Sequence, residues 1–201
     1  MEGIRGVEVR PLRRDEIPAA ARLAARALRD NPSQVAVHGD DPDQRVRGLE
    51  ILCRLSLVAR RYPALAAYRD GALVGVLSAA PPGACTPSLL QQLRMAPSLL
   101  RFKPETLARV ARYGAAWQQH EPKERHWHVG PVAVEPALQG QGIGSAMLAR
   151  FCTRMDERGD QAYLETDTPA NVALYRRFGF DVIAEAAILG APYWFMRRRS
   201  R

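Results

Sequence analysis

The apolar and polar residues of the first eighty positions alternate at spacings that predict strands and helices in turn. Val7 to Arg10 predict a short first strand, and Asp15 is placed to cap a helix that extends to about Arg29. A second helix is expected to open at Asp40-Asp41-Pro42-Asp43, where an apolar stripe at helical spacing begins. Asp70-Gly71 predicts a hairpin, because these residues readily adopt the positive φ of a tight turn.

The rest of the chain begins with a proline-rich segment and continues with alternating strands and helices. Residues 80–104 combine prolines with short apolar runs, which indicates loops and short helices inserted beside the core. Gly142 to Arg158 predict a helix, because Ile143, Met147, Phe151 and Met155 recur every four residues. Further helices are expected at 105–120 and 169–178, and strands at 127–134, 162–166, 180–185 and 193–197. This order predicts one α/β domain with a mixed sheet.

The composition limits the classes of protein that remain. An apolar fraction of 47% supports a packed core, and no apolar run approaches the roughly 18 residues that a membrane span needs. The charged N-terminal residues contain no apolar signal region, so we expect a cytoplasmic protein with no membrane partner. The cysteines Cys53, Cys85 and Cys152 form no CxxC pair and suggest no disulfide framework, which fits a reducing compartment.

The net charge of +8 is compatible with two kinds of partner, a nucleic acid or a polyanionic cofactor. Arginine supplies 27 of the 29 basic residues, which with the abundant alanine suggests a GC-rich bacterial genome. The sequence holds no nucleic-acid recognition motif, so we expect no nucleic-acid partner. Residues 197–201, which are almost all arginine, are expected to form a solvated tail.

A glycine-rich segment at the start of a helix carries the clearest chemical signal. It reads Gln139-Gly140-Gln141-Gly142-Ile143-Gly144-Ser145 and follows a predicted strand. Glycines allow a tight bend and a close approach of a ligand, and the first helical turn presents unused N–H groups at the positive end of the helix dipole. The segment therefore predicts an anion site suited to a pyrophosphate.

The spacing of these glycines excludes two common nucleotide-binding motifs. A dinucleotide-binding fingerprint needs G-x-G-x-x-G, but position 145 is serine and Gly144 comes one residue early. A P-loop needs a lysine before its Ser or Thr, and this segment has none.

Three blocks in the last 80 or so residues resemble one enzyme family. Gln139-x-x-Gly142-x-Gly144 is similar to the (Arg/Gln)-x-x-Gly-x-(Gly/Ala) signature of the GNAT family of N-acetyltransferases. Residues 130–134 before it resemble the central strand of that family, and residues 171–180 after it resemble its second motif. Within the family the chain is most similar to puromycin N-acetyltransferase-like proteins, on residues 122–124, 142–146 and 164–166.

The resemblance implies a fold and a donor. It implies a mixed, mostly antiparallel sheet flanked by helices and splayed between the strands near 132 and 164. Acetyl-CoA is the implied co-substrate. The whole chain, 1–201, would form a single domain. Residues of about 126–199 would make the acetyl-CoA-binding core, and residues of about 13–120 the helices and insert on the acceptor side. The coenzyme-binding residues implied are Val132, Ala133, Val134, Gln139, Gly140, Gln141, Gly142, Ile143, Gly144, Ser145, Asn171 and Tyr175.

Two residues are implied to act on protons. Tyr175 would be the general acid, since a phenol with an ordinary pKa of about 10 suits proton donation to a leaving thiolate; packing of the helix is the other interpretation. Glu165 would be the general base for the substrate ammonium, directly or through a water; an ion pair or a substrate-orienting anion is an equal alternative. His126 and His128 lie on one face of a predicted strand, where a polar sheet face is favoured over a proton-shuttling role. No third ligand accompanies them, so no metal is expected.

These inferences predict a bacterial enzyme that transfers acetyl from acetyl-CoA to a small primary amine by direct attack. No cysteine or serine nucleophile constellation is evident, so no acetyl-enzyme is expected. An enzyme for protein N-termini or lysines, and a regulatory module that binds acetyl-CoA without turnover, stay open as alternatives. A homodimer is compatible with the sequence.

Overall fold

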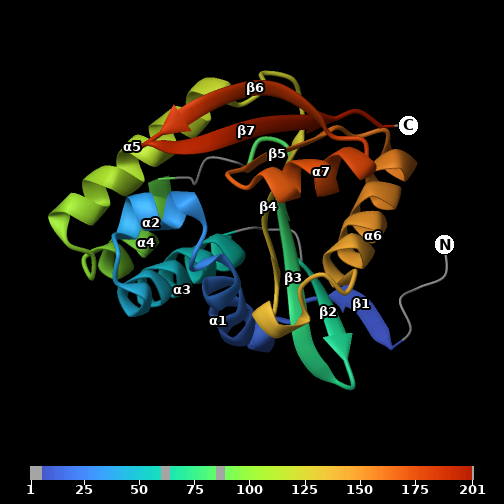
Figure 1. Cartoon of the computed structure of the whole chain (residues 1–201), viewed down its shortest axis with the longest axis horizontal. Coiled ribbons are helices and arrows are strands. Elements are labelled where there is room, and N and C mark those ends of the chain that lie inside the picture. The colour runs from blue at the N-terminus through green and yellow to red at the C-terminus, as the bar shows by residue number, and fades with distance from the viewer. Residues whose placement is uncertain (1–5, 60–63, 85–88, 201) are drawn as a thin grey trace.

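Seven strands form one sheet in a computed structural model that describes residues 6–59, 64–84 and 89–200 (Figure 1). The strand order is β1-β2-β3-β4-β5-β7-β6, and every neighbouring pair is antiparallel except β4 and β5. The predicted mixed, mostly antiparallel sheet is therefore confirmed. The strands are β1 (Val7–Pro11), β2 (Leu65–Arg69), β3 (Ala72–Ala80), β4 (Trp127–Val134), β5 (Ala162–Thr166), β6 (Asp181–Ile188) and β7 (Ala191–Arg198).

Helices cover both faces of the sheet. On one face α6 and α7 pack against the largest apolar cluster, which includes Met147, Phe151 and Leu164. On the other face α1 and α3 cover β2 to β4, and α5 covers β5 to β7. The helices are α1 (Ile17–Leu28), α2 (Pro32–His38), α3 (Pro42–Ala59), α4 (Leu89–Leu99), α5 (Pro104–His120), α6 (Ile143–Arg158) and α7 (Pro169–Arg177). None of these helices, within the described ranges, is long and apolar enough to cross a membrane.

The two parallel strands separate soon after they meet. They pair only at Trp127 with Ala162 and at His128 with Tyr163, as far as the described residues go. Beyond these positions β4 stays with β3 and β5 stays with β7. This separation is the splay expected between the strands near 132 and 164.

A β-bulge on β4 sets which side chains face each helix layer. Val129 pairs with Ala79 and Val132 with Leu77, so two residues of β4 stand opposite the single residue Ser78. The extra residue reverses the alternation of the strand. Val129 before the bulge and Val132 after it therefore both face the α6 layer, whereas Ala133 faces α1.

The beginning and the end of the chain differ from the sequence predictions. Helix α2 was not predicted, because Pro32 begins a new helix after ending the previous one; proline is well tolerated in a first turn. Asp15 does not cap α1: it pairs with Arg13 at 2.7 Å, and it lies inside a short 3₁₀ turn. Cys85 lies outside the described residues, and Cys53 and Cys152 are buried in the core.

The expectation of a solvated arginine tail is wrong for Arg198. Its side chain is 3% exposed, and it donates to Asp156 on α6 at 2.6 Å and to the carbonyl of Phe178 at 2.8 Å. The last strand therefore continues through Arg198, since a buried, paired guanidinium ties β7 to α6.

Glu16 joins β1, β2 and the start of α1. Its carboxylate accepts hydrogen bonds from the Arg10 guanidinium at 3.1 Å, the Tyr68 hydroxyl at 2.6 Å and the Arg13 amide at 2.9 Å. The guanidinium of Arg10 stacks over the Tyr68 ring at 3.7 Å. Chiefly because of the Arg10 hydrogen bond, the pKa of Glu16 is lowered to about 2.

Glu16 is expected to make folding stability sensitive to acid. Its folded pKa lies below the unfolded value, so its contribution is present above the unfolded pKa and is lost as pH falls towards about 2. Denaturant titrations at pH values from about 5 to about 2 should therefore show that the free energy of unfolding falls in the wild type. In Glu16→Gln the same fall should be smaller by roughly 1–2 kcal/mol. Glu8→Gln, an exposed neighbour, should behave like the wild type; equal acid sensitivity in all three proteins would contradict the assignment.

Candidate active site

The glycine loop connects the end of β4 to the first turn of α6. Gly140 has φ +76° and Gly142 has φ +81°, which is the left-handed region that favours glycine. Gly144 is different, since it lies in the helix and an added Cβ would meet only the Val134 Cγ2 at 3.7 Å, an ordinary contact. The backbone conformation therefore favours glycine at 140 and 142. At 144 the backbone does not require glycine, and the absence of a side chain leaves space in the lining of the pocket described next.

A pocket of about 410 Å³ lies against this loop. It is bounded by β4, the loop, the first turn of α6, one side of α7 and the end of α1. Every implied coenzyme-binding residue lines it except Gln141, whose side chain accepts a hydrogen bond from Arg69 at 2.7 Å. The lining also includes residues that the sequence did not indicate: Ala27, Leu28, Leu138, Ala170, Leu174 and Arg177.

The polar groups of this pocket suit an anion. The amides at the start of α6 precede the first helical hydrogen bond, which runs from Ala146 to the carbonyl of Gly142. Arg177 adds a cationic side chain from the last turn of α7. Gln139 instead donates its side-chain amide to the carbonyl of Val134 at 3.2 Å, which ties the loop to β4.

Tyr175 lies on α7 at the wall of the pocket and is 7% exposed. Burial raises the pKa of its hydroxyl above the ordinary value, and the carboxylates of Asp167 and Glu165 raise it further. The phenol therefore remains protonated at physiological pH and is available as a hydrogen-bond donor.

Glu165 lies on the opposite face of the sheet, outside the pocket lining. Its Oε2 is 3.0 Å from Nε2 of His128, and its side chain is 5% exposed. Its Oε1 is buried and has no hydrogen-bond partner within the described parts of the chain. The pair joins β5 to β4 where the two strands begin to separate, so His128 holds Oε2 while Oε1 lies buried. The Glu165 carboxylate also helps to raise the pKa of the neighbouring Tyr163 hydroxyl, after the effect of burial.

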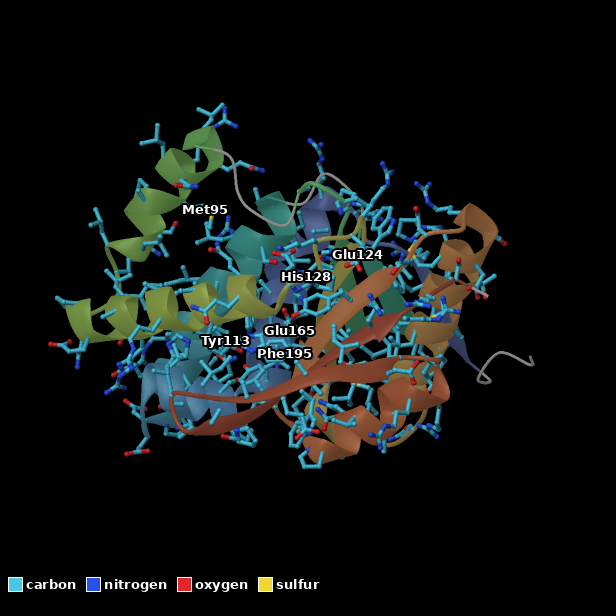
Figure 2. The ribbon with its side chains drawn as sticks, turned by 90° about the horizontal axis from the view of Figure 1, so that it is seen from above. Met95, Tyr113, Glu124, His128, Glu165 and Phe195 are labelled. Carbon is cyan, nitrogen blue, oxygen red and sulfur yellow. The ribbon has the colours of Figure 1, made fainter. Side chains whose placement is uncertain are left out.

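Aromatic side chains surround this pair on the α5 face. The His128 ring lies 5.3 Å from Tyr163 and 6.1 Å from Trp117, between ring centroids. Figure 2 shows His128 and Glu165 together beside α5, with Tyr113 and Phe195 next to them. The histidine face is thus not the plain polar sheet face that was favoured from the sequence: it is buried and largely aromatic.

Asp167 connects two parts of the chain around the pocket. This buried carboxylate accepts hydrogen bonds from the Ser33 amide at 2.9 Å, the Asn31 side chain at 3.1 Å and the Thr168 hydroxyl at 3.1 Å. It thereby fixes the α1–α2 corner to the β5–α7 corner. No group of three metal-binding side chains occurs among the residues for which positions are described.

The splayed sheet and the glycine loop at a helix N-terminus define the class of the protein, an α/β acyltransferase fold. The chain belongs to the acetyltransferase (GNAT) family, whose model matches residues 26–180.

Individual relatives agree with this assignment. N-alpha-acetyltransferase RimI of Mycobacterium tuberculosis is 38% identical over 80 residues, which are 37% of this chain and 49% of that protein. A histone acetyltransferase HPA2-related structure from Corynebacterium glutamicum superposes with a TM-score of 0.72 at 20% identity, covering 98% of this chain and 97% of that one. A GNAT acetyltransferase of Brucella melitensis, solved with acetyl-CoA, has a TM-score of 0.54 at 18% identity, covering 96% and 87%. The matched segments cover 49% of RimI and 20% of a mycothiol acetyltransferase from Mycolicibacterium gilvum, so the chain spans less than half the length of these curated relatives.

Proposed function

We propose that the protein transfers the acetyl group of acetyl-CoA to the primary amine of a small molecule by direct attack. One observation carries the proposal: the pocket beside the glycine loop is lined by the first turn of α6, by β4 where it has separated from β5, and by Tyr175 on α7. A thioester placed in that gap would have an acid on one side and a base on the other.

The pocket of about 410 Å³ would hold the pantetheine and pyrophosphate portion of the donor. The amides from Gly142 to Ser145 would bind its pyrophosphate, since they precede the helical hydrogen bonds and lie at the positive end of the helix dipole. Val132 and Val134 would offer backbone groups to the pantetheine arm, because β4 has no partner strand on this side beyond His128 within the described chain. Asn171 would add a side-chain amide from α7.

Glu165 would take the proton of the substrate ammonium. The amine must be neutral to attack the thioester, and a carboxylate near the splay with one oxygen outside any hydrogen bond of the described chain would serve as the base. His128 would hold the other oxygen, Oε2. Binding both reactants in this orientation supplies a further part of the rate.

Two features favour a small acceptor. Helix α5 and an aromatic layer cover the sheet face next to Glu165, which restricts the space for an extended peptide. The short motifs shared with puromycin N-acetyltransferase-like proteins point in the same direction, without naming the acceptor. A peptide acceptor is the second candidate, since one relative is called an N-alpha-acetyltransferase.

The proposal also includes a homodimer, a cytoplasmic location and the absence of a nucleic-acid partner.

The test is consumption of acetyl-CoA with a panel of amines. Aromatic and aliphatic amines are compared with short peptides that carry a free N-terminus, and release of the coenzyme thiol is followed. Turnover with small amines supports the proposal, and turnover with peptides alone replaces it by the second candidate. Tight binding of acetyl-CoA with no turnover would identify a regulatory module.

Tyr175→Phe is expected to lower kcat roughly tenfold or more and to leave the affinity for acetyl-CoA unchanged. The substitution removes the hydroxyl that would donate to the departing sulfur but keeps the ring against Phe180, 6.0 Å away between centroids. Steady-state kinetics and calorimetry measure the two quantities. An unchanged kcat would remove Tyr175 from the mechanism.

A further inference from the structure

The side chain of Gln141 points away from the pocket that the rest of the glycine loop lines. Its Oε1 instead accepts a hydrogen bond from Nη1 of Arg69 at 2.7 Å. Arg69 is the last residue of β2 and comes directly before the Asp70-Gly71 turn, where Asp70 has a φ of +50°. A side chain from the β2–β3 hairpin therefore holds the middle of the glycine loop from outside.

The part of the loop around Gln141 depends on such a contact for its shape. Gly140 and Gly142 lie on either side of it, and glycine loses more conformational freedom than any other residue when its backbone is fixed. Gln139 holds only the start of the loop, through the carbonyl of Val134 at 3.2 Å. The contact of Gln141 with β2 lies between the two glycines, where the backbone is intrinsically most free.

The β2–β3 hairpin is a firm support, because it also packs against the start of α6. A Cβ added to Gly75 on β3 would lie 2.9 Å from Cε of Met147 and 3.3 Å from Cγ2 of Ile143. The amide of Glu135, directly after β4, donates to the carbonyl of Val74 at 3.0 Å. The hairpin is thus fixed to both ends of the segment that contains the glycine loop.

We propose that Arg69 positions the glycine loop for the diphosphate of the donor, by holding Gln141 outside the pocket. The proposal rests on the proposed function. The amides of the loop can converge on a diphosphate only in a defined backbone arrangement. A loop that is held in this arrangement beforehand loses less conformational entropy when the ligand binds, so the affinity is higher. Arg69 is a positioning residue, since it acts through Gln141.

The experiment compares Arg69→Met, Gln141→Ala and the double variant with the wild type. Calorimetry measures the affinity for acetyl-CoA, and steady-state kinetics measure kcat and KM. The kinetics are repeated with S-acetylpantetheine, which has the same thioester but no diphosphate. The control is Arg109→Met, which also removes one positive charge. Arg109 is exposed on α5, which covers β5 to β7 and not β2.

Each single variant is expected to bind acetyl-CoA about threefold to fivefold more weakly than the wild type, with KM raised to match and kcat unchanged. The double variant should bind no more weakly than either single variant, because both substitutions break the same contact. With S-acetylpantetheine all variants should have the kcat/KM of the wild type. Arg109→Met should match the wild type with both donors.

Three results would overturn the role of Arg69. These are wild-type affinity in Gln141→Ala, losses that add up in the double variant, and an equal loss with S-acetylpantetheine, which would indicate a general disturbance of the site. Absence of acetyl-CoA binding by the wild type overturns the proposed function instead, so the two failures are distinct.

Discussion

Glutamine in place of Glu165 is expected to lower kcat by about a hundredfold or more while the affinity for acetyl-CoA stays unchanged. The amide still accepts a hydrogen bond from His128 at the present Oε2 position, 3.0 Å away, so the fold around the splay is retained. What it loses is the ability to take a proton from the substrate ammonium. Steady-state kinetics with a saturating donor measure the loss, and calorimetry measures the donor affinity.

The control for this substitution is Glu185→Gln. Glu185 lies on β6, which β7 separates from β5, and its side chain is exposed, so the same change of charge there should leave kcat within about twofold of the wild type. If Glu165→Gln kept most of its activity, the carboxylate would be an ion-pair partner of His128 and another group, or water, would be the base.

Valine in place of Gly144 is expected to abolish acetyl-CoA binding without unfolding the protein. The backbone at 144 has no positive φ, and the nearest atom to an added Cβ is 3.7 Å away, so the empty protein accommodates the first carbon. The added branches would occupy the space next to the amides that are proposed to bind the pyrophosphate. Calorimetric titration with acetyl-CoA should show at least a hundredfold loss of affinity, about 2.7 kcal/mol.

Gly114→Val is the matched control. Gly114 is also a helical glycine, and an added Cβ there would meet nothing within 4 Å, but it lies on α5 and outside the pocket. Valine is a slightly better helix former than glycine, so both substitutions change helix propensity in the same direction and by a similar amount. Circular dichroism and thermal unfolding should therefore show similar stability for the two variants. Equal acetyl-CoA binding by both variants would place the pyrophosphate elsewhere.

Local sequence signals predicted most of the fold. The helix at Ile143–Arg158 and the hairpin at Asp70-Gly71 depend on short-range spacing and turn chemistry, which are visible in a single sequence. Helix α2 was missed because Asn31-Pro32 carries the same signal whether a helix ends or another begins there. The burial of Arg198 was missed because the partner, Asp156, is distant in sequence.

In the candidate site, too, local sequence patterns indicated some features, whereas features that depend on residues distant in sequence were missed. The pocket proposed for the coenzyme is lined mainly by one continuous stretch, from β4 into α6, so the glycine spacing could point to this part of the chain. The contact of His128 with Glu165 depends on the register of two parallel strands, which no local pattern records. Leu28 on the pocket wall gave no signal, since an apolar residue on α1 looks the same whether it faces the core or a ligand.

The carboxylate of Asp167 links the two sides of the pocket that is proposed to bind the coenzyme. Its bonds to Asn31 and Ser33 hold the end of α1, where Ala27 and Leu28 form one wall, against the corner that leads to Ala170 and Asn171. A ligand that fills the pocket would contact both the end of α1 and the β5–α7 corner, in addition to the hydrogen bonds of Asp167. Such a ligand binds only when both sides of the pocket are assembled. We therefore expect its binding energy to raise the melting temperature of the N-terminal half and of the C-terminal half together, as one cooperative unit.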